Sequence, residues 1–200
     1  MSADSSNTLL PVEKQRTAAL TLKTARLVLR PLVIADAPRI QELAGAREVA
    51  LNTLLIPHPY PDGAAEAWIS KPSPEVRFAI DDGELVGVIG LRVHRDDDRA
   101  EIGYWIGVPY WGRGYASEAA AAVVRYGFEE LALNKIYAGY FSRNPASGAV
   151  LRKIGMHHEG TLRQHHKKWS EYVDVEFYAI LRSDFTIRTA APYSVFPASS

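Results

Sequence analysis

The sequence predicts an α/β (α+β) domain with one mixed, mostly antiparallel central sheet of about seven strands and helices on both faces. Two observations predict it. The chain alternates between the two-residue hydrophobic period of strands and the 3.6-residue period of helices. Its elements are expected in the order β-α-α-β-β-β-α-β-α-β-β, which is typical of a single sheet covered by helices. With 200 residues, of which 47% are hydrophobic, the chain is long enough for one buried core.

The folded part is expected to span residues 21–187, between a polar N-terminal tail (1–20) and a C-terminal tail (188–200) of prolines and small residues. Acidic and basic residues balance at 23 each, which argues against a partner that is nucleic acid or a membrane surface. The sequence contains no secretion signal, no apolar run of membrane-spanning length and no cysteine. We therefore expect a cytoplasmic protein whose chemistry uses no thiol.

The first half is expected to open with a strand at 25–32 and a helix at 34–45. Asp36 is placed to cap that helix and Gly45 to end it. After the proline-rich segment 54–63, the sequence predicts a short helix and three strands, at 64–70, 75–81, 84–94 and 100–108.

Two turns separate the three strands. Asp82-Gly83 is a strong hairpin signal. The polar segment 94–101 contains three aspartates without calcium-loop spacing, so we expect a solvated turn there.

The second half is expected to contain a long helix from about Ser117 to Leu131 and a strand at 135–142. One face of the long helix is apolar, formed by Ala116, Ala120, Val123, Gly127 and Leu131. A second helix at 144–155 has clear ends, since Asn144 can cap it, Pro145 fits its first turn and Gly155 can stop it. Two antiparallel strands follow, at 156–169 and 171–182.

The segment 107–124, "GVPYWGRGYASEAAAAVV", takes a strand through a glycine-rich bend into a helix N-terminus. The free amides and dipole of a helix N-terminus favour an anion, and Arg113 adds a cation suited to phosphate. The segment lacks the Gly-Lys-Ser/Thr of a P-loop, and Ser117 breaks the Rossmann pattern. From the glycines alone, a tight turn without ligand is an equal alternative.

"EIGYWIGVPYWGRGYASEA", followed by "NPASGAVLRKIGMHHEGTLRQ", resembles the GNAT superfamily of acetyl-CoA-dependent N-acetyltransferases over residues 22–185. "TARLVLRPL" is similar to the branch of the RimJ/RimL ribosomal-protein N-terminal acetyltransferases. The resemblance implies a GNAT fold in which a bulge at Gly107 splays its strand from the neighbouring one.

The resemblance also implies where acetyl-CoA, the cosubstrate, binds. Backbone groups of Ile106 and Val108 would contact the pantetheine arm, together with Asn144 and Ser147. The loop that holds the pyrophosphate maps to Trp111, Gly112, Arg113, Gly114, Tyr115 and Ala116, with Ser117 following in the helix. Trp111 stands where the general pattern has a polar residue.

In such enzymes the amine attacks the thioester directly, which needs a base and an acid. The family's tyrosine acid maps to Leu151, so Ser147 is the best substitute; the alternative is a serine bonded to nearby backbone. Glu101 is the first choice for the base because it shares a strand face with Gly103, although it could be an ordinary surface glutamate. Asp174 and Glu176 are further base candidates.

The sequence is therefore compatible with two functions. The first is acetyl-CoA-dependent acetylation of a primary amine, either the N-terminal α-amine of a protein or peptide or a small amine, by a monomer or homodimer. The second is a non-catalytic acyl-CoA sensor, which Leu151 favours. Segment 54–68 and the final hairpin are expected to select the acceptor. No metal is expected, because His157 and His165 of the histidine-rich strand would lie roughly 26 Å apart.

Overall fold

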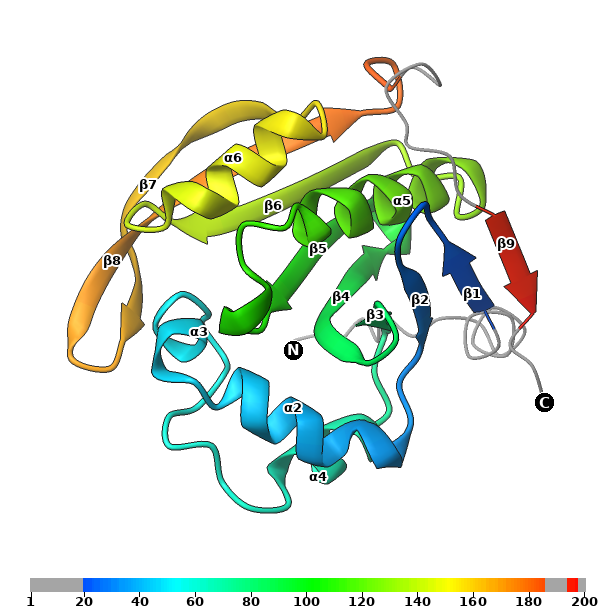
Figure 1. The fold of residues 1–200 in the computed structure, drawn as a ribbon. Helices are drawn as coiled ribbons and strands as arrows, with labels where there is room; N and C mark the ends of the chain where they lie inside the picture. The colour runs from blue at the N-terminus through cyan, green and yellow to red at the C-terminus, as the bar shows by residue number, and fades with distance from the viewer. Residues whose placement is uncertain (1–19, 186–193, 198–200) are drawn as a thin grey trace, which may run out of the picture.

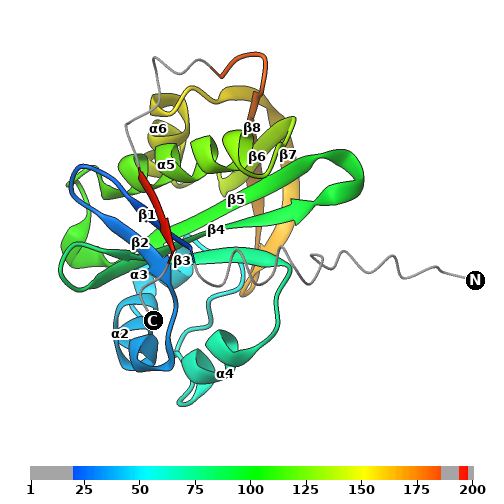
Figure 2. The same ribbon diagram turned by 90° about the vertical axis from the view of Figure 1, so that its right-hand side faces the viewer.

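A computed structural model describes residues 20–185 and 194–197. Within this range nine strands form one sheet in the order β7-β8-β6-β5-β4-β3-β2-β1-β9. All neighbouring strands are antiparallel except β5 and β6, which are parallel. Helices α2 to α4 lie on one side of the sheet and α5 and α6 on the other (Figures 1 and 2). The predicted fold class is confirmed.

The strands are β1 (Leu20–Lys23), β2 (Val28–Pro31), β3 (Glu75–Asp81), β4 (Leu85–His94), β5 (Arg99–Ile106), β6 (Lys135–Phe141), β7 (His157–Lys168), β8 (Glu171–Leu181) and β9 (Ser194–Pro197). The helices are α2 (Ala37–Ala44), α3 (Arg47–Leu51), α4 (Ala64–Ser70), α5 (Tyr115–Glu129) and α6 (Pro145–Lys153), with short 3-10 turns at Ile34–Asp36, Arg95–Asp97 and Val108–Tyr110.

The two extra strands lie at the start and end of the described chain. The strand predicted at 25–32 corresponds to β2, and β1 precedes it in a hairpin whose turn is closed by a Thr24 N–H bond to the Leu27 carbonyl (2.9 Å). This turn contains neither glycine nor proline, so the sequence carries no turn signal there. Strand β9 pairs with β1 and lies inside the predicted C-terminal tail, which is a correction. Leu20, the last residue of the predicted N-terminal tail, begins β1, and the rest of both predicted tails lies outside the described residues.

Asp36 precedes α2 as predicted, but its side chain does not cap that helix. Its carboxylate accepts hydrogen bonds from Arg30 (2.8 and 2.9 Å) and from the Val33 N–H (2.9 Å). A buried carboxylate is far better compensated by a guanidinium than by one amide, which explains the difference. Gly45 ends α2 as predicted.

The other predicted ends are close to the observed ones. Gly83 has a φ of +113° in the β3–β4 turn, a conformation that favours glycine. Asn144 caps α6 by accepting a hydrogen bond from the Ser147 N–H (3.3 Å), and Gly155 (φ +88°) follows its end. Helix α3 has no counterpart in the prediction.

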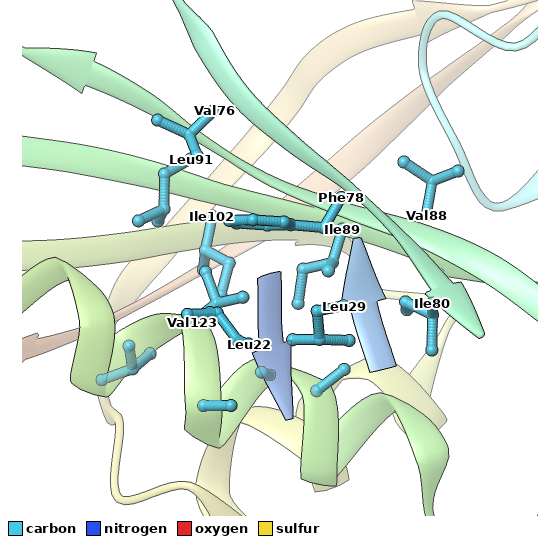
Figure 3. Packing of buried hydrophobic residues seen from close by; sticks show 14 of the residues in the cluster. Leu22, Leu29, Val76, Phe78, Ile80, Val88, Ile89, Leu91, Ile102 and Val123 are labelled. Atoms are coloured by element: carbon cyan, nitrogen blue, oxygen red, sulfur yellow. The ribbon is translucent and has the colours of Figure 1, made fainter. Parts of the chain in front are cut away.

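The main core lies between α5 and the strands β3 to β5. Val76, Leu91 and Ile102 share the face of the sheet that α5 covers, and Val123 of α5 lies beside Ile102 (Figure 3). Each is at most 3% exposed. On the opposite face of the sheet, Gly90 of β4 pairs with Gly103 of β5. Two neighbouring strands thus carry no side chain at one level, which leaves a hollow on that face.

Candidate active site

Strands β5 and β6 separate soon after they begin. They pair only between Arg99–Glu101 and Lys135–Tyr137. The Gly107 N–H donates to the Val86 carbonyl (2.9 Å), so alternation along the strand turns the backbone groups of Ile106 away from β4, toward the open edge. The predicted splay is therefore present, and the backbone of Ile106 faces it.

The predicted bulge at Gly107 is absent. The β4–β5 register runs without a shift up to Ile106, and Gly107 has an ordinary extended backbone. A Cβ at Gly107 would lie 2.8 Å from the Leu43 side chain of α2. Glycine is needed here because the helix packs closely, and the splay comes from β6 diverging from β5 while it stays paired with β8.

The glycine loop has the conformation expected of an anion-binding turn. Gly112 (φ +77°) and Gly114 (φ +80°) both adopt the left-handed backbone that favours glycine. Gly114 is the N-cap of α5 and no side chain caps the helix, so its first amides are not occupied by a cap. A Cβ placed on Gly112 would meet nothing within 4 Å, so the loop borders open space.

Two predicted loop residues also make contacts within the chain. The Trp111 indole donates to the Ile106 carbonyl (2.7 Å), and its ring is 48% exposed. The Arg113 guanidinium donates to the Pro109 carbonyl (3.1 Å) and lies over the Tyr110 ring. Val108 lies in the 3-10 turn between β5 and the loop, and its carbonyl accepts from the Trp111 N–H.

Arg26 is a second cation at this loop, which the sequence analysis did not single out. It donates to the Arg113 carbonyl (3.0 Å) and pairs with Glu118 of α5 (2.7 Å). Burial alone would raise the pKa of Glu118, but hydrogen bonds from Thr24 and Arg26 outweigh it and lower that pKa. The segment that contains Arg26 contributed to the family resemblance. The contact of Arg26 with the glycine loop is visible only in the structure.

A cavity of about 560 Å³ lies at the splay. Glu101, Gly103 and Trp105 reach it from one face of β5, and Tyr104 reaches it from the other. Alternate residues of a strand point to opposite faces, so one cavity can touch both only where β6 has left. Ser147 and Leu151 of α6 line the same cavity. The predicted base and the predicted acid are thus brought together.

Ser147 has a partner that the sequence analysis missed. The Tyr104 hydroxyl lies 3.1 Å from the Ser147 Oγ and 3.3 Å from the Ser147 carbonyl. Burial raises the pKa of the Tyr104 hydroxyl to about 12, despite the opposing hydrogen bond with Ser147. Leu151, one turn further along, is a buried apolar wall.

The base candidates differ in position. Glu101 lines the cavity and its carboxylate lies 3.7 Å from Arg92. Asp174 and Glu176 lie on the opposite face of β8 from Val175 and Phe177, which line the cavity.

The carboxylates on β8 are already engaged. Hydrogen bonds from Ser142, Thr161 and His158 to Glu176 (2.7, 2.7 and 2.8 Å) lower its pKa. Asp174 accepts a hydrogen bond from the Gln164 N–H (2.6 Å). Neither carboxylate faces the cavity.

The far wall is built by the two segments expected to select the acceptor. It comprises Leu54, Leu55, Ile56, Pro57, Tyr60 and Trp68 from the first segment and His166, Val175 and Phe177 from the hairpin. Buried Lys168 joins them by donating to the carbonyls of Leu54 (3.2 Å) and Ile56 (2.9 Å). Burial, rather than a nearby charge, is the main cause that lowers the pKa of His166.

In the part of the chain that the structure describes, no three His, Cys, Asp or Glu side chains are grouped so that they could hold a metal ion. Among the helices of residues 20–185, none is long and apolar enough to cross a lipid bilayer.

A family model described as an acetyltransferase (GNAT) domain matches residues 26–157. The uncharacterized N-acetyltransferase p20 of Bacillus licheniformis is 30% identical over 174 residues, which is 82% of this chain and 98% of that protein. The uncharacterized N-acetyltransferase YoaA of Bacillus subtilis (strain 168) is 42% identical over 106 residues, 51% of this chain; this chain spans only 58% of that relative.

Among solved structures, the spermidine N-acetyltransferase of Vibrio cholerae in complex with CoA and spermine has a TM-score of 0.71 at 25% identity. The match covers 80% of this chain and 98% of that one.

Proposed function

Because this chain belongs to the GNAT acetyltransferase family, we propose that it acetylates a primary amine directly from acetyl-CoA, using Glu101 as base and Ser147 as acid. The single observation that carries this assignment is the cavity through the β5–β6 splay, which both side chains line. The acceptor class is the N-terminal α-amine of a protein or peptide, or a small amine. Membership of the RimJ/RimL-like branch belongs to the same proposal and rests on "TARLVLRPL".

The chain has the groups that a CoA thioester needs. The amides around Gly112 and Gly114 and the N-terminus of α5 would hold the diphosphate, from Trp111 to Ser117, with Arg113 and Arg26 as nearby cations. The backbone of Ile106 and Val108 would hold the pantetheine arm, together with Asn144 and Ser147. Bound there, acetyl-CoA supplies an acetyl group activated as a thioester.

The base must take one proton from the attacking amine. Glu101 is suited to this because it faces the cavity and its neighbouring cation, Arg92, lies beyond hydrogen-bond distance at 3.7 Å. As the amine nitrogen bonds to the acetyl carbon and the carbon–sulfur bond breaks, this proton passes to Glu101, directly or through one water. The products are the N-acetylated amine and a free thiol.

The departing sulfur must gain one proton. Ser147 is the proposed donor, and Tyr104 is a positioning residue that holds the Ser147 Oγ. With its pKa near 12, the Tyr104 phenol stays neutral at physiological pH and keeps this hydrogen bond. Together, Ser147 and Tyr104 would protonate the departing sulfur, which Leu151 cannot do because it has no acidic proton.

The test is thiol release from acetyl-CoA with a panel of amines and peptides, together with the shift of melting temperature that acetyl-CoA causes. We expect a thermal shift and turnover of at least one amine. Leu151 favours a second function, an acyl-CoA sensor, which predicts the thermal shift without turnover of any amine. A melting temperature that acetyl-CoA does not change contradicts both functions.

A further inference from the structure

A row of alternating charges crosses the sheet at one end of the cavity. The strand register pairs Glu75 with Arg92, and Arg92 with Glu101. All three line the cavity. The next level of the same face holds Gly90 and Gly103, and a Cβ on Gly103 would meet nothing within 4 Å. The charged row therefore borders the open space above Gly103.

Glu75 holds one edge of the Arg92 guanidinium and leaves the Nη1 group available for a ligand. The Nε and Nη2 of Arg92 both donate to Glu75 Oε1 (3.0 and 2.6 Å). The Nη1 end faces Glu101 at 3.7 Å, too far for a hydrogen bond. A guanidinium has five donors, so the held side chain still presents N–H groups next to the proposed base.

This arrangement suits a small molecule with opposite charges on adjacent groups. An α-amino acid carries its amine and its carboxylate on one carbon, and a guanidinium is the side chain best suited to a carboxylate. Resting on the proposed function, we propose that the acceptor is a free α-amino acid, its carboxylate on Arg92 and its amine on Glu101. Arg92 thereby turns the amine toward the base.

The charge balance of the cavity disfavours polycations. Its two carboxylates, Glu75 and Glu101, are matched by two guanidinium groups, Arg92 and Arg77. Arg77 is held by the Trp68 and Lys71 carbonyls (3.0 and 3.1 Å). A polyamine would bring several cations to a cavity with no excess of negative charge, which costs desolvation without compensation.

A peptide N-terminus fits less well than a free amino acid. Its first carbonyl is neutral and gives Arg92 a weaker hydrogen bond than a carboxylate does. The rest of the lining is mostly apolar and includes the aromatic side chains of Tyr60, Trp68, Trp105 and Phe177. They fit an apolar or aromatic side chain, so phenylalanine is a suitable probe.

The first experiment uses the full wild-type chain with acetyl-CoA and five acceptors: L-phenylalanine, L-phenylalaninamide, phenethylamine, Phe-Gly-Gly and spermidine. Thiol release gives kcat/KM for each. We expect kcat/KM for phenylalanine to exceed that for each of the other four acceptors by about 10-fold or more. This factor corresponds to the free energy of one charge-assisted hydrogen bond. A preference for the amide, peptide, simple amine or spermidine, or no preference among them, overturns the inference.

The second experiment compares Arg92→Gln with Arg99→Gln. Arg99 is a matched control on β5, since it is 43% exposed against 42% for Arg92 and is paired with Asp97. Arg92→Gln should lower kcat/KM for phenylalanine by about 10- to 100-fold more than it lowers kcat/KM for phenethylamine. Arg99→Gln should change neither.

Two controls separate the possible failures. Circular dichroism and the acetyl-CoA thermal shift check that Arg92→Gln is folded, and Arg92→Lys gives a second variant that keeps the charge and should recover part of the loss. An equal loss of kcat/KM for both acceptors contradicts this inference but not the proposed function. If wild-type protein acetylates phenethylamine but not phenylalanine, the proposed function stands and this inference fails; if it acetylates no amine, both fail.

Discussion

The Tyr104 hydroxyl lies 3.1 Å from the Ser147 Oγ, across the space where β5 and β6 separate. This contact joins the first strand of the splay to the first turn of α6. Tyr104→Phe removes the hydrogen bond and keeps the ring, so we expect kcat to fall about 10- to 100-fold with KM for acetyl-CoA nearly unchanged. Steady-state kinetics with a saturating amine measure both.

A double-mutant cycle tests whether Tyr104 acts through Ser147. Adding Tyr104→Phe to Ser147→Ala should cost little more than Ser147→Ala alone. Tyr172→Phe is the control, because it removes the phenol of a 64%-exposed residue of β8 that does not line the cavity. Additive losses from the first two changes would show that Tyr104 acts independently of Ser147.

Glu101→Gln keeps the shape of the side chain and removes its ability to accept a proton. We expect kcat/KM to fall by about 10²- to 10⁴-fold near neutral pH. The loss should shrink as the pH rises, because a larger fraction of the amine is then already neutral. Rate profiles from pH 6 to 10 measure it.

Glu176→Gln is the companion variant. Its carboxylate faces away from the cavity and holds Ser142, Thr161 and His158, so kcat/KM should stay within about 3-fold of wild type. If Glu176→Gln instead shows the pH-dependent loss, the base assignment moves from β5 to β8.

The sequence predicted most of the fold because its local signals were strong. The glycines at 83 and 155 and the cap at Asn144 act within a few residues, and each has the predicted conformation. The hairpin β1–β2 was missed because its turn contains neither glycine nor proline. The role of Asp36 was misjudged because the pattern of a helix cap does not show that the Arg30 guanidinium binds this carboxylate. Strand β9 owes its place to β1, which no local pattern reveals.

Part of the site was equally predictable. The glycine loop has a local signature, and the strand period placed Glu101 on an open face. Tyr104 could not be assigned, since alternation puts it opposite Glu101, and only the departure of β6 lets both reach one cavity. The part played by Arg92 depends on cross-strand register with Glu75, which sequence periods do not give.

Gly112→Ala tests the anion loop. Alanine at a φ of +77° costs about 1–2 kcal/mol unless the loop changes shape, so we expect affinity for acetyl-CoA to fall about 10-fold or more. Calorimetric titration measures it. Gly83→Ala is the matched control, because Gly83 also has a positive φ and open space around its Cβ but lies in the β3–β4 turn. Equal loss of affinity in both variants would contradict a role of this loop in binding.

Glu118→Gln tests the anchor between Arg26 and α5. At pH 7 we expect the free energy of unfolding to fall by about 1 kcal/mol, because a half-buried carboxylate loses its charge toward Arg26. The pKa of Glu118 is lowered by folding, so its contribution is complete above the unfolded value of about 4.3 and is lost as pH falls through the lower folded value.

Urea denaturation at several pH values should therefore show the two proteins converging below about pH 4. Glu159→Gln, which removes a 45%-exposed carboxylate paired with Lys135, should have little effect at any pH. A constant difference between Glu118→Gln and wild type down to pH 3 would contradict the ion-pair explanation.

Lys168→Met tests the link between the acceptor loop and the final hairpin. Lys168 is 4% exposed and donates to two loop carbonyls, at Leu54 and Ile56, whereas the neighbouring Lys167 is exposed over the Tyr172 ring. Without these hydrogen bonds the loop should be ordered only when the acceptor binds, which raises KM for the acceptor by about 5- to 20-fold. Affinity for acetyl-CoA should not change, because the hydrogen bonds of Lys168 go to the acceptor loop and not to the glycine loop 111–117. Lys167→Met is the control for the change of charge and should match wild type in both measurements. Equal rises in the two KM values would mean that Lys168 supports the whole fold and not the acceptor wall.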